Sequence, residues 1–227
     1  MVHHIKHMAR LDDFIVEIEN FISKTECEEL IDIHKSSQLF VFKGQMGGND
    51  VEDESIKQST DLHLHFCDHS NALELEEKYN KKLTEIMNEY VDIVTRKHPQ
   101  YSGILQRYLT PKDKNNYTHT SGVQVQLTSP GQQFKWHADY GESSMGRMFA
   151  FIVYLNDVNV DFEGGYTEFE HRRVVPEAGK LLIFPIDTFL PGLYHRGVVV
   201  ESGAKYIFTA FLARGGEGIQ DDFKTKY

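Results

Sequence analysis

A succession of short β-rich runs, each closed by a turn signal, fills the second half of this 227-residue chain and most constrains its fold. The runs are Val123–Thr128, Phe134–Asp139, Arg147–Asn156, Thr167–Phe169, Lys180–Pro185, Tyr194–Val200 and Lys205–Ala213. Turn signals such as Pro130-Gly131, Gly164-Gly165 and Pro191-Gly192 separate them. Regular short strands without helices between them are typical of a barrel or a double-sheet jelly roll.

The first half of the chain has a different pattern, with helices between a few strands. Phe14–Phe21, Leu39–Phe42 and Thr60–Phe66 have the composition of strands. Ser23, with Glu26 three residues later, gives a capping-box start for a short helix. Apolar residues then recur at helical spacing from about 70 to 97. The sequence predicts an α+β fold in one domain over residues 1–227, with a jelly-roll core at about 121–213 and supporting helices at about 11–100.

Composition limits the partners and the setting of the protein. The net charge of −10 argues against a nucleic acid held through its phosphates. Two cysteines are too few for a disulfide framework and suggest a reducing compartment. The longest unbroken apolar run, Met148–Leu155, is too short to span a membrane, and the N-terminus lacks the apolar segment of a signal peptide. We therefore expect a cytoplasmic protein without a membrane partner.

One of the predicted strands carries a pair of candidate metal ligands. In Phe134–Asp139, His137 and Asp139 are two residues apart, so an extended strand points both side chains to the same face. One imidazole and one carboxylate are two thirds of a 2-His-1-carboxylate triad, which leaves three adjacent positions open on Fe(II). Such pairs also arise by chance, so the assignment depends on the rest of the chain.

Several motifs follow the His-x-Asp pair in an order that resembles a known family. His195 lies in a late strand, and the basic Lys205 comes ten residues after it. This order resembles the Fe(II)/2-oxoglutarate dioxygenases, specifically the prolyl 4-hydroxylase-like branch. The flanking stretches that also resemble this branch are Phe21–Leu30, Val123–Gln132, Tyr154–Asp157, Gly164–Phe169, Pro176–Gly179, His195–Gly197 and Gly203–Tyr206.

The resemblance implies a double-stranded β-helix and a set of site residues. His137, Asp139 and His195 would hold Fe(II), and Lys205 would bind the distal carboxylate of 2-oxoglutarate. Tyr154 would add a hydrogen bond to this cosubstrate. Thr128 would line its pocket, where the family often has a tyrosine before the Pro-Gly turn. Ascorbate is a further cofactor that the resemblance admits. The chain departs from the family again at Tyr166, where Gly-Gly-Glu-Thr is common, and this affects contacts near the substrate.

The implied activity is an O₂- and 2-oxoglutarate-dependent hydroxylation that yields succinate and CO₂. By analogy the substrate is a proline in a peptide or protein. The alternatives are hydroxylation of another side chain or of a free amino acid, and a non-catalytic jelly roll that binds a ligand or a metal. A zinc hydrolase is a further alternative, but it would want a different ligand set. Lys205 disfavours the non-catalytic roll, because such a roll has no need of an inward-facing cation.

The direction of Lys205 can also be predicted from the turn before it. A three-residue turn, Glu201–Gly203, would suit glycine at its last position and would pair Val199 with Lys205. Lys205 would then share a face with His195. A buried ammonium is costly without an anion, and the far carboxylate of 2-oxoglutarate would be that anion.

Three other features admit more than one interpretation. The alternating His63, His65, Cys67 and His69 fit a half-buried strand better than a zinc site, because no second ligand pair follows. The glycine-rich, acidic stretch Gly44–Glu54 is either a lid over the substrate or a surface loop. Trp136 either packs in the core or lies near the iron.

Overall fold

The computed structural model describes residues 10–45, 52–110, 116–139, 146–186 and 193–216. The described part of the chain contains three α-helices, α1 (Lys24–Ser36), α2 (Ala72–Lys97) and α3 (Ser102–Leu109). Short 3-10 helices cover Leu11–Phe14, Leu64–Phe66 and Pro99–Tyr101. The strands are β1 (Val16–Ile18), β2 (Phe42–Lys43), β3 (Thr60–His63), β4 (Asn116–Thr120), β5 (Gln124–Thr128), β6 (Phe134–His137), β7 (Arg147–Tyr154), β8 (Phe162–Gly164), β9 (Thr167–Phe169), β10 (Arg173–Val174), β11 (Leu181–Pro185), β12 (His195–Gly197), β13 (Val200–Gly203) and β14 (Lys205–Gly216).

A large antiparallel sheet forms one wall of the structure. Within the described residues its strand order is β1-β11-β7-β14-β5-β3-β2, and β4 also pairs with β14. The inner strand β7 is buried along almost its whole length because it has packed side chains on both faces. This explains why its sequence is a continuous apolar run and does not alternate with polar residues. The β-rich runs predicted at 123–128, 147–156, 180–185 and 205–213 all fall on strands of this sheet.

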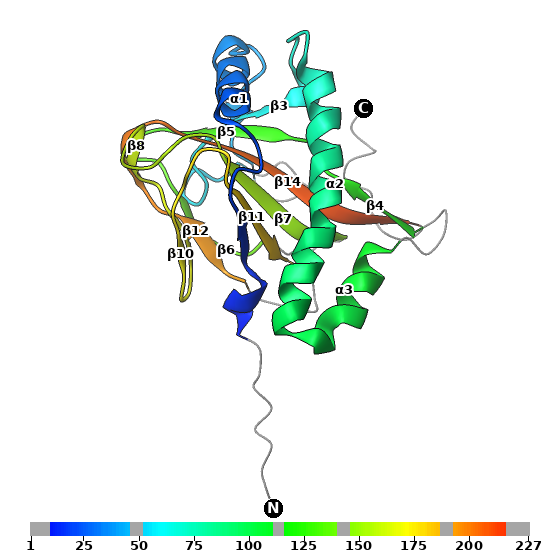
Figure 1. Ribbon diagram of the computed structural model, residues 1–227. Helices are drawn as coiled ribbons and strands as arrows, with labels where there is room; N and C mark the ends of the chain where they lie inside the picture. Colours follow the sequence, from blue (N-terminus) through cyan, green and yellow to red (C-terminus); the bar gives the residue numbers. More distant parts are fainter. Residues whose placement is uncertain (1–9, 46–51, 111–115, 140–145, 187–192, 217–227) are drawn as a thin grey trace, which may run out of the picture.

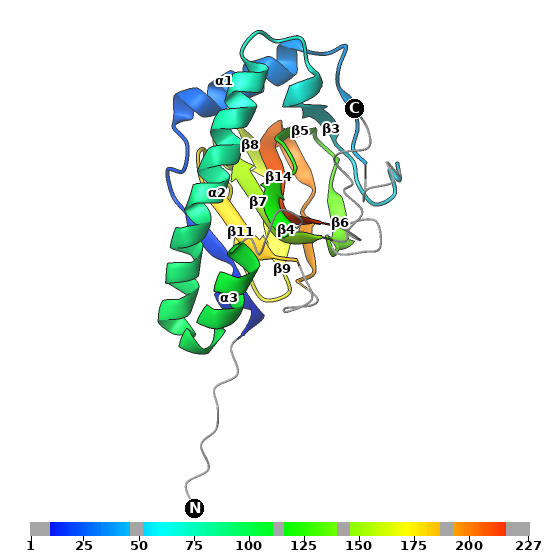
Figure 2. The same ribbon diagram turned by 90° about the vertical axis from the view of Figure 1, so that its right-hand side faces the viewer.

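Helices cover the outer face of the large sheet (Figures 1 and 2). The predicted apolar stripe of α2 is confirmed: one side of the helix is buried, and it includes Leu75, Tyr79, Leu83, Met87, Tyr90 and Val94. Tyr79 packs on Phe208 of β14 with ring centroids 5.4 Å apart, and Tyr90 packs on Phe149 of β7 at 5.1 Å. The predicted capping box is also present, because the Ser23 and Glu26 side chains each accept a hydrogen bond from the other's backbone N–H.

A smaller sheet faces the large one from the side away from the helices. Its order is β10-β9-β12-β6, and the β13-β8 pair lies beside it. Figure 2 shows β6 across the molecule from α1 and α2. Part of the space between the sheets is filled by an apolar cluster that includes Ile152, Phe169, Phe184 and Leu193. The two facing sheets form the predicted jelly-roll core, and the helices lie outside it.

Two local predictions are wrong. The hairpin between β13 and β14 does not form, because β13 pairs with β8, while β14 pairs with β5, β7 and β4. Lys205 lies opposite Thr128 instead of Val199. Gly203 does have the positive φ expected at that position, +74°, but a Cβ there would meet the backbone of Asp161 and Phe162. The strand predicted at Leu39–Phe42 is also misplaced, since β2 begins at Phe42 and Leu39 is exposed.

Gly179 joins the N-terminal segment to the sheet, and its replacement tests how this junction contributes to stability. Its φ is +84°, and a Cβ here would lie 2.2 Å from the Ile22 carbonyl oxygen. We expect Gly179→Ala to lower the free energy of unfolding by more than about 1 kcal/mol, because the cost of backbone strain adds to the cost of the clash with Ile22. Gly131→Ala is the matched control, since Gly131 has φ +83° but nothing within 4 Å of its Cβ position. Equal melting temperatures of the two variants would contradict the clash.

None of the helices in the described ranges is both long enough and apolar enough to cross a membrane.

Candidate metal centre and cosubstrate pocket

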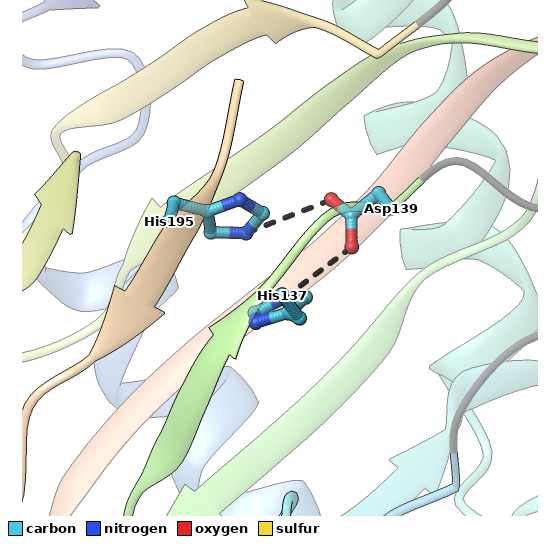
Figure 3. Close-up of side chains that lie close together, drawn as sticks. All are labelled: His137, Asp139 and His195. Carbon is cyan, nitrogen blue, oxygen red and sulfur yellow. Dashed lines mark ion pairs between the residues drawn. The ribbon is translucent and has the colours of Figure 1, made fainter. Parts of the chain in front are cut away.

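Two neighbouring strands of the small sheet bring the three candidate ligands together. His195 on β12 lies directly opposite His137 on β6 in the antiparallel register. Asp139 follows the end of β6, and its carboxylate reaches both rings (Figure 3). The His137 Nε2–Asp139 Oδ1 distance is 3.4 Å, and the His195 Nε2–Asp139 Oδ2 distance is 3.7 Å. One ligand atom from each of the three residues can thus be found within 4.8 Å of the others.

Backbone carbonyls fix the tautomer of both imidazoles. The Nδ1 atom of His137 lies 2.8 Å from the Lys135 carbonyl oxygen, and the Nδ1 atom of His195 lies 3.3 Å from that of Leu193. Each Nδ1–H therefore donates to the backbone, which leaves Nε2 with its lone pair directed toward Asp139. Among the residues that the structure describes, the buried Nε2 of His137 has no hydrogen-bond partner. An unsatisfied basic nitrogen in this position is what a metal ligand requires.

The electrostatics of the cluster favour the protonation states that a metal needs. Burial lowers the pKa of His195 to about 4, so its imidazole is neutral at physiological pH. Burial alone would raise the pKa of Asp139, but His195, His137 and Arg147 outweigh it and hold this pKa well below the usual range. A neutral imidazole and an ionised carboxylate can coordinate a cation without first losing a proton.

Lys205 is a buried cation at the start of β14. Its side chain is almost fully buried, and its ammonium nitrogen lies 5.8 Å from the centre of the Tyr154 ring. No carboxylate among the described residues pairs with it. Burial lowers the pKa of Lys205 to about 8. An ammonium in such a place is stable only when an anion joins it.

Asn156 and Gly165, which had no predicted role in the site, hold Lys205 in position. The Asn156 side-chain amide donates to the Ala204 carbonyl at 2.7 Å, and its oxygen accepts from the Tyr206 N–H at 2.9 Å. The residues on both sides of Lys205 are therefore fixed. A Cβ on Gly165, at φ +60°, would lie 3.1 Å from the Lys205 side chain, so glycine permits this close approach.

The other two predicted cosubstrate residues lie beside Lys205. Thr128 is its partner on β5, and Tyr154 on β7 is fully buried. The Tyr154 hydroxyl donates a hydrogen bond of 2.7 Å to Thr167, and burial raises its pKa, so the hydroxyl stays protonated. Thr167 belongs to β9, which pairs with the His195 strand. This contact links the wall that carries Lys205 to the metal-site sheet.

The family profile described as the 2OG-Fe(II) oxygenase superfamily matches residues 123–213, which contain all of these side chains. Residues 123–213 carry a 2OG-Fe(II) oxygenase domain. The protein is an Fe(II)/2-oxoglutarate-dependent dioxygenase, and its cofactors are Fe(II) and 2-oxoglutarate. The geometry fits these cofactors, since two imidazole nitrogens and one carboxylate are a ligand set of non-haem Fe(II) oxygenases. The search of curated proteins found no match to this oxygenase.

Solved structures with the same fold include several prolyl hydroxylases. The viral collagen prolyl hydroxylase of Paramecium Bursaria Chlorella virus-1, solved with 2OG, is 19% identical with a TM-score of 0.54, over 91% of this oxygenase and 99% of that chain. A Trichoplax adhaerens prolyl hydroxylase in complex with a hypoxia inducible factor peptide is 18% identical with a TM-score of 0.61, over 88% and 84%. A Pseudomonas putida prolyl-4-hydroxylase is 15% identical with a TM-score of 0.59, over 91% and 97%. At these identities the likeness establishes the fold.

Trp136 of the oxygenase is a partly exposed residue of β6. It is 45% exposed, and the Arg196 guanidinium lies 5.0 Å from its ring centre. Arg196 follows His195 on β12 and so faces the other side of the sheet, where it donates to Glu168 at 2.6 and 2.9 Å. The prediction that Trp136 packs in the core is therefore wrong, and a place near the iron stays a prediction.

The histidine-rich run departs from a regular strand. β3 ends at His63, and Leu64–Phe66 form a 3-10 turn, so the alternation does not continue. His65 lies 3.1 Å from the Glu76 carboxylate, and the His63 ring stacks on Phe42. The predicted loop Gly44–Glu54 falls largely on residues 46–51, which lie outside the described residues.

Proposed function

We propose that this oxygenase hydroxylates a proline residue in a peptide or protein substrate. The observation that carries the proposal is the arrangement of its site. A His/Asp/His cluster on the small sheet and a buried ammonium on the large sheet are linked by the Tyr154–Thr167 hydrogen bond. This arrangement suits a dicarboxylic oxo acid whose keto end meets the metal and whose far carboxylate meets Lys205.

In this proposal His137, Asp139 and His195 hold Fe(II) and leave three adjacent positions open. Lys205 binds the distal carboxylate of 2-oxoglutarate, while Tyr154 and Thr128 line the pocket around it. When bound, Fe(II) together with 2-oxoglutarate and O₂ supplies the oxidising power that hydroxylates an unactivated C–H bond, with succinate and CO₂ as by-products. The protein orients the cosubstrate and keeps water from its buried end, because Lys205 and Tyr154 are both almost inaccessible to solvent.

The structural neighbours support the choice of proline. Three of them are prolyl hydroxylases, and one is in complex with a peptide from hypoxia inducible factor. The fold is shared over most of their length, although many substrates can be served by one fold. A peptide substrate is therefore part of the proposal.

Succinate release from 2-oxoglutarate across a panel of substrates tests the proposal. The panel contains proline-bearing peptides, the same peptides with alanine in place of proline, and free amino acids, each with and without ascorbate. We expect succinate formation coupled to a mass increase of one oxygen, located on proline by fragmentation. Oxygen addition to another side chain or to a free amino acid would replace proline as the substrate. Coupled turnover by His195→Ala would contradict the site itself.

A further inference from the structure

A buried ion pair that the chemistry above does not use lies near the metal centre. The Lys57 ammonium is 2.7 Å from the Asp61 carboxylate, and the two side chains are 6% and 0% exposed. The second oxygen of Asp61 is buried and has no hydrogen-bond partner within the described part of the chain. Ion pairs this deeply buried are seldom a net gain in stability over apolar residues, so their retention suggests another role.

The residues around Lys57 run along the edge of the small sheet, beside β6. The Lys135 N–H donates to the Ile56 carbonyl at 2.9 Å, and the Gln58 N–H donates to the Gln133 carbonyl at 3.0 Å. Between these bonds Lys57 forms an isolated bridge with Phe134. Lys135 is also the residue whose carbonyl orients the His137 imidazole. The backbone that carries the ion pair and the backbone that aims the metal ligand are thus directly connected.

Side chains make a second connection between the ion pair and the ligand. The Lys57 ammonium lies 5.7 Å from the centre of the Phe134 ring, within the range of a cation–π contact. Phe134 in turn stacks on His137, with ring centres 3.5 Å apart and planes 13° apart. A bulge in the β6–β12 pairing permits this stacking, because it lets Phe134 and His137 share a face.

We propose that the Lys57–Asp61 ion pair is a positioning device for His137. The Asp61 carboxylate fixes the Lys57 ammonium, and Lys57 with its backbone segment fixes Phe134 and Lys135. The Phe134 ring then sets the plane of the His137 imidazole, and the Lys135 carbonyl sets its tautomer. The proposal rests on the proposed role of His137 as a metal ligand. Residues that orient metal ligands typically contribute about 10- to 100-fold to metal affinity, and we expect an effect of this size here.

Titration of the metal-free protein with Co(II), followed by its visible absorption, tests this role without turnover. Lys57→Met and Asp61→Asn should each weaken Co(II) binding about 10- to 100-fold and alter the absorption band. Phe134→Leu keeps the ion pair but removes the stacked ring, and it should weaken binding in the same direction.

Lys180→Met is the matched control. Lys180 is equally buried and has three carboxylate partners, Glu17, Glu19 and Glu177, on the strand β1 side of the large sheet. Its loss should lower the melting temperature and leave Co(II) affinity unchanged. Wild-type Co(II) affinity in folded Lys57→Met would overturn the proposal. If Lys57→Met does not fold, Phe134→Leu decides in the same way. Wild-type protein that binds Co(II) no better than His195→Ala would overturn the proposed metal site as well.

Discussion

The His195→Ala variant is expected to lose 2-oxoglutarate turnover to background, and so are His137→Ala and Asp139→Ala. This type of site holds its metal with only three protein ligands, so the loss of one removes a third of the protein's ligand set. Each imidazole places its Nε2 beside the shared carboxylate. The loss should exceed the roughly 10- to 100-fold effect of removing a residue that only orients a ligand. Succinate formation and Fe(II) content of the purified variants are the measurements.

The fold should survive these ligand substitutions. β12 stays hydrogen-bonded to both β9 and β6 when the His195 ring is removed. The ring does pack on Phe184, with centres 4.8 Å apart, so the melting temperature should fall by a few degrees. His65→Ala is a matched control, because it removes another histidine that pairs with a carboxylate, outside the candidate site. Full turnover by His195→Ala would refute the ligand assignment.

Lys205→Met is expected to increase the KM for 2-oxoglutarate by a factor between about 30 and about 5,000, with little effect on metal binding. This range corresponds to the roughly 2–5 kcal/mol that is lost when one partner of a buried charge pair is removed. Methionine nearly keeps the length and volume of the side chain, so the comparison isolates the charge. Steady-state kinetics and a Co(II) titration measure the two effects separately.

The same substitution should stabilise the ligand-free protein. Burial depresses the pKa of Lys205 to about 8 from its unfolded value of 10.5, so the folded state binds this proton less tightly. The resulting destabilisation is complete below about pH 8 and disappears as the pH rises toward 10.5. At pH 7 it is on the order of 3 kcal/mol. Melting curves should show Lys205→Met above wild type at pH 7 and near it at pH 10.5. A normal 2-oxoglutarate KM in this variant would exclude the carboxylate role.

The strand pattern of the second half was predictable because it is a local property of the sequence. The apolar runs of β7 and β11 and the capping box at Ser23 depend on residues close in the chain. The pairing of His137 with His195 is not local, so the sequence could supply the ligands but not their register. His137 and Asp139 do lie side by side, but not through strand alternation. The strand β6 ends at His137, so Asp139 reaches the site from the segment after the strand.

Residues that support the site gave weaker signals than those that compose it. Lys57 lies in a polar stretch, and nothing nearby in the sequence shows that it will be buried and paired with Asp61. Asn156 belongs to the Tyr-Leu-Asn-Asp motif, yet its role depends on β14 arriving beside it. The burial of Lys205 was predicted from a hairpin that does not form. The inward direction is set instead by the pairing of β14 with β5.

The position of β12 inside the small sheet has a consequence for the order of folding. This strand has three residues and forms ladder hydrogen bonds to β9 on one side and β6 on the other, both far away in sequence. Closing such long loops is entropically costly, so these pairings should form late. The proposed metal ligands His137 and His195 meet only when β12 has joined β6. In a refolding experiment, the recovery of Co(II) absorption would therefore report when the jelly roll closes. We expect this recovery after the helical signal has returned.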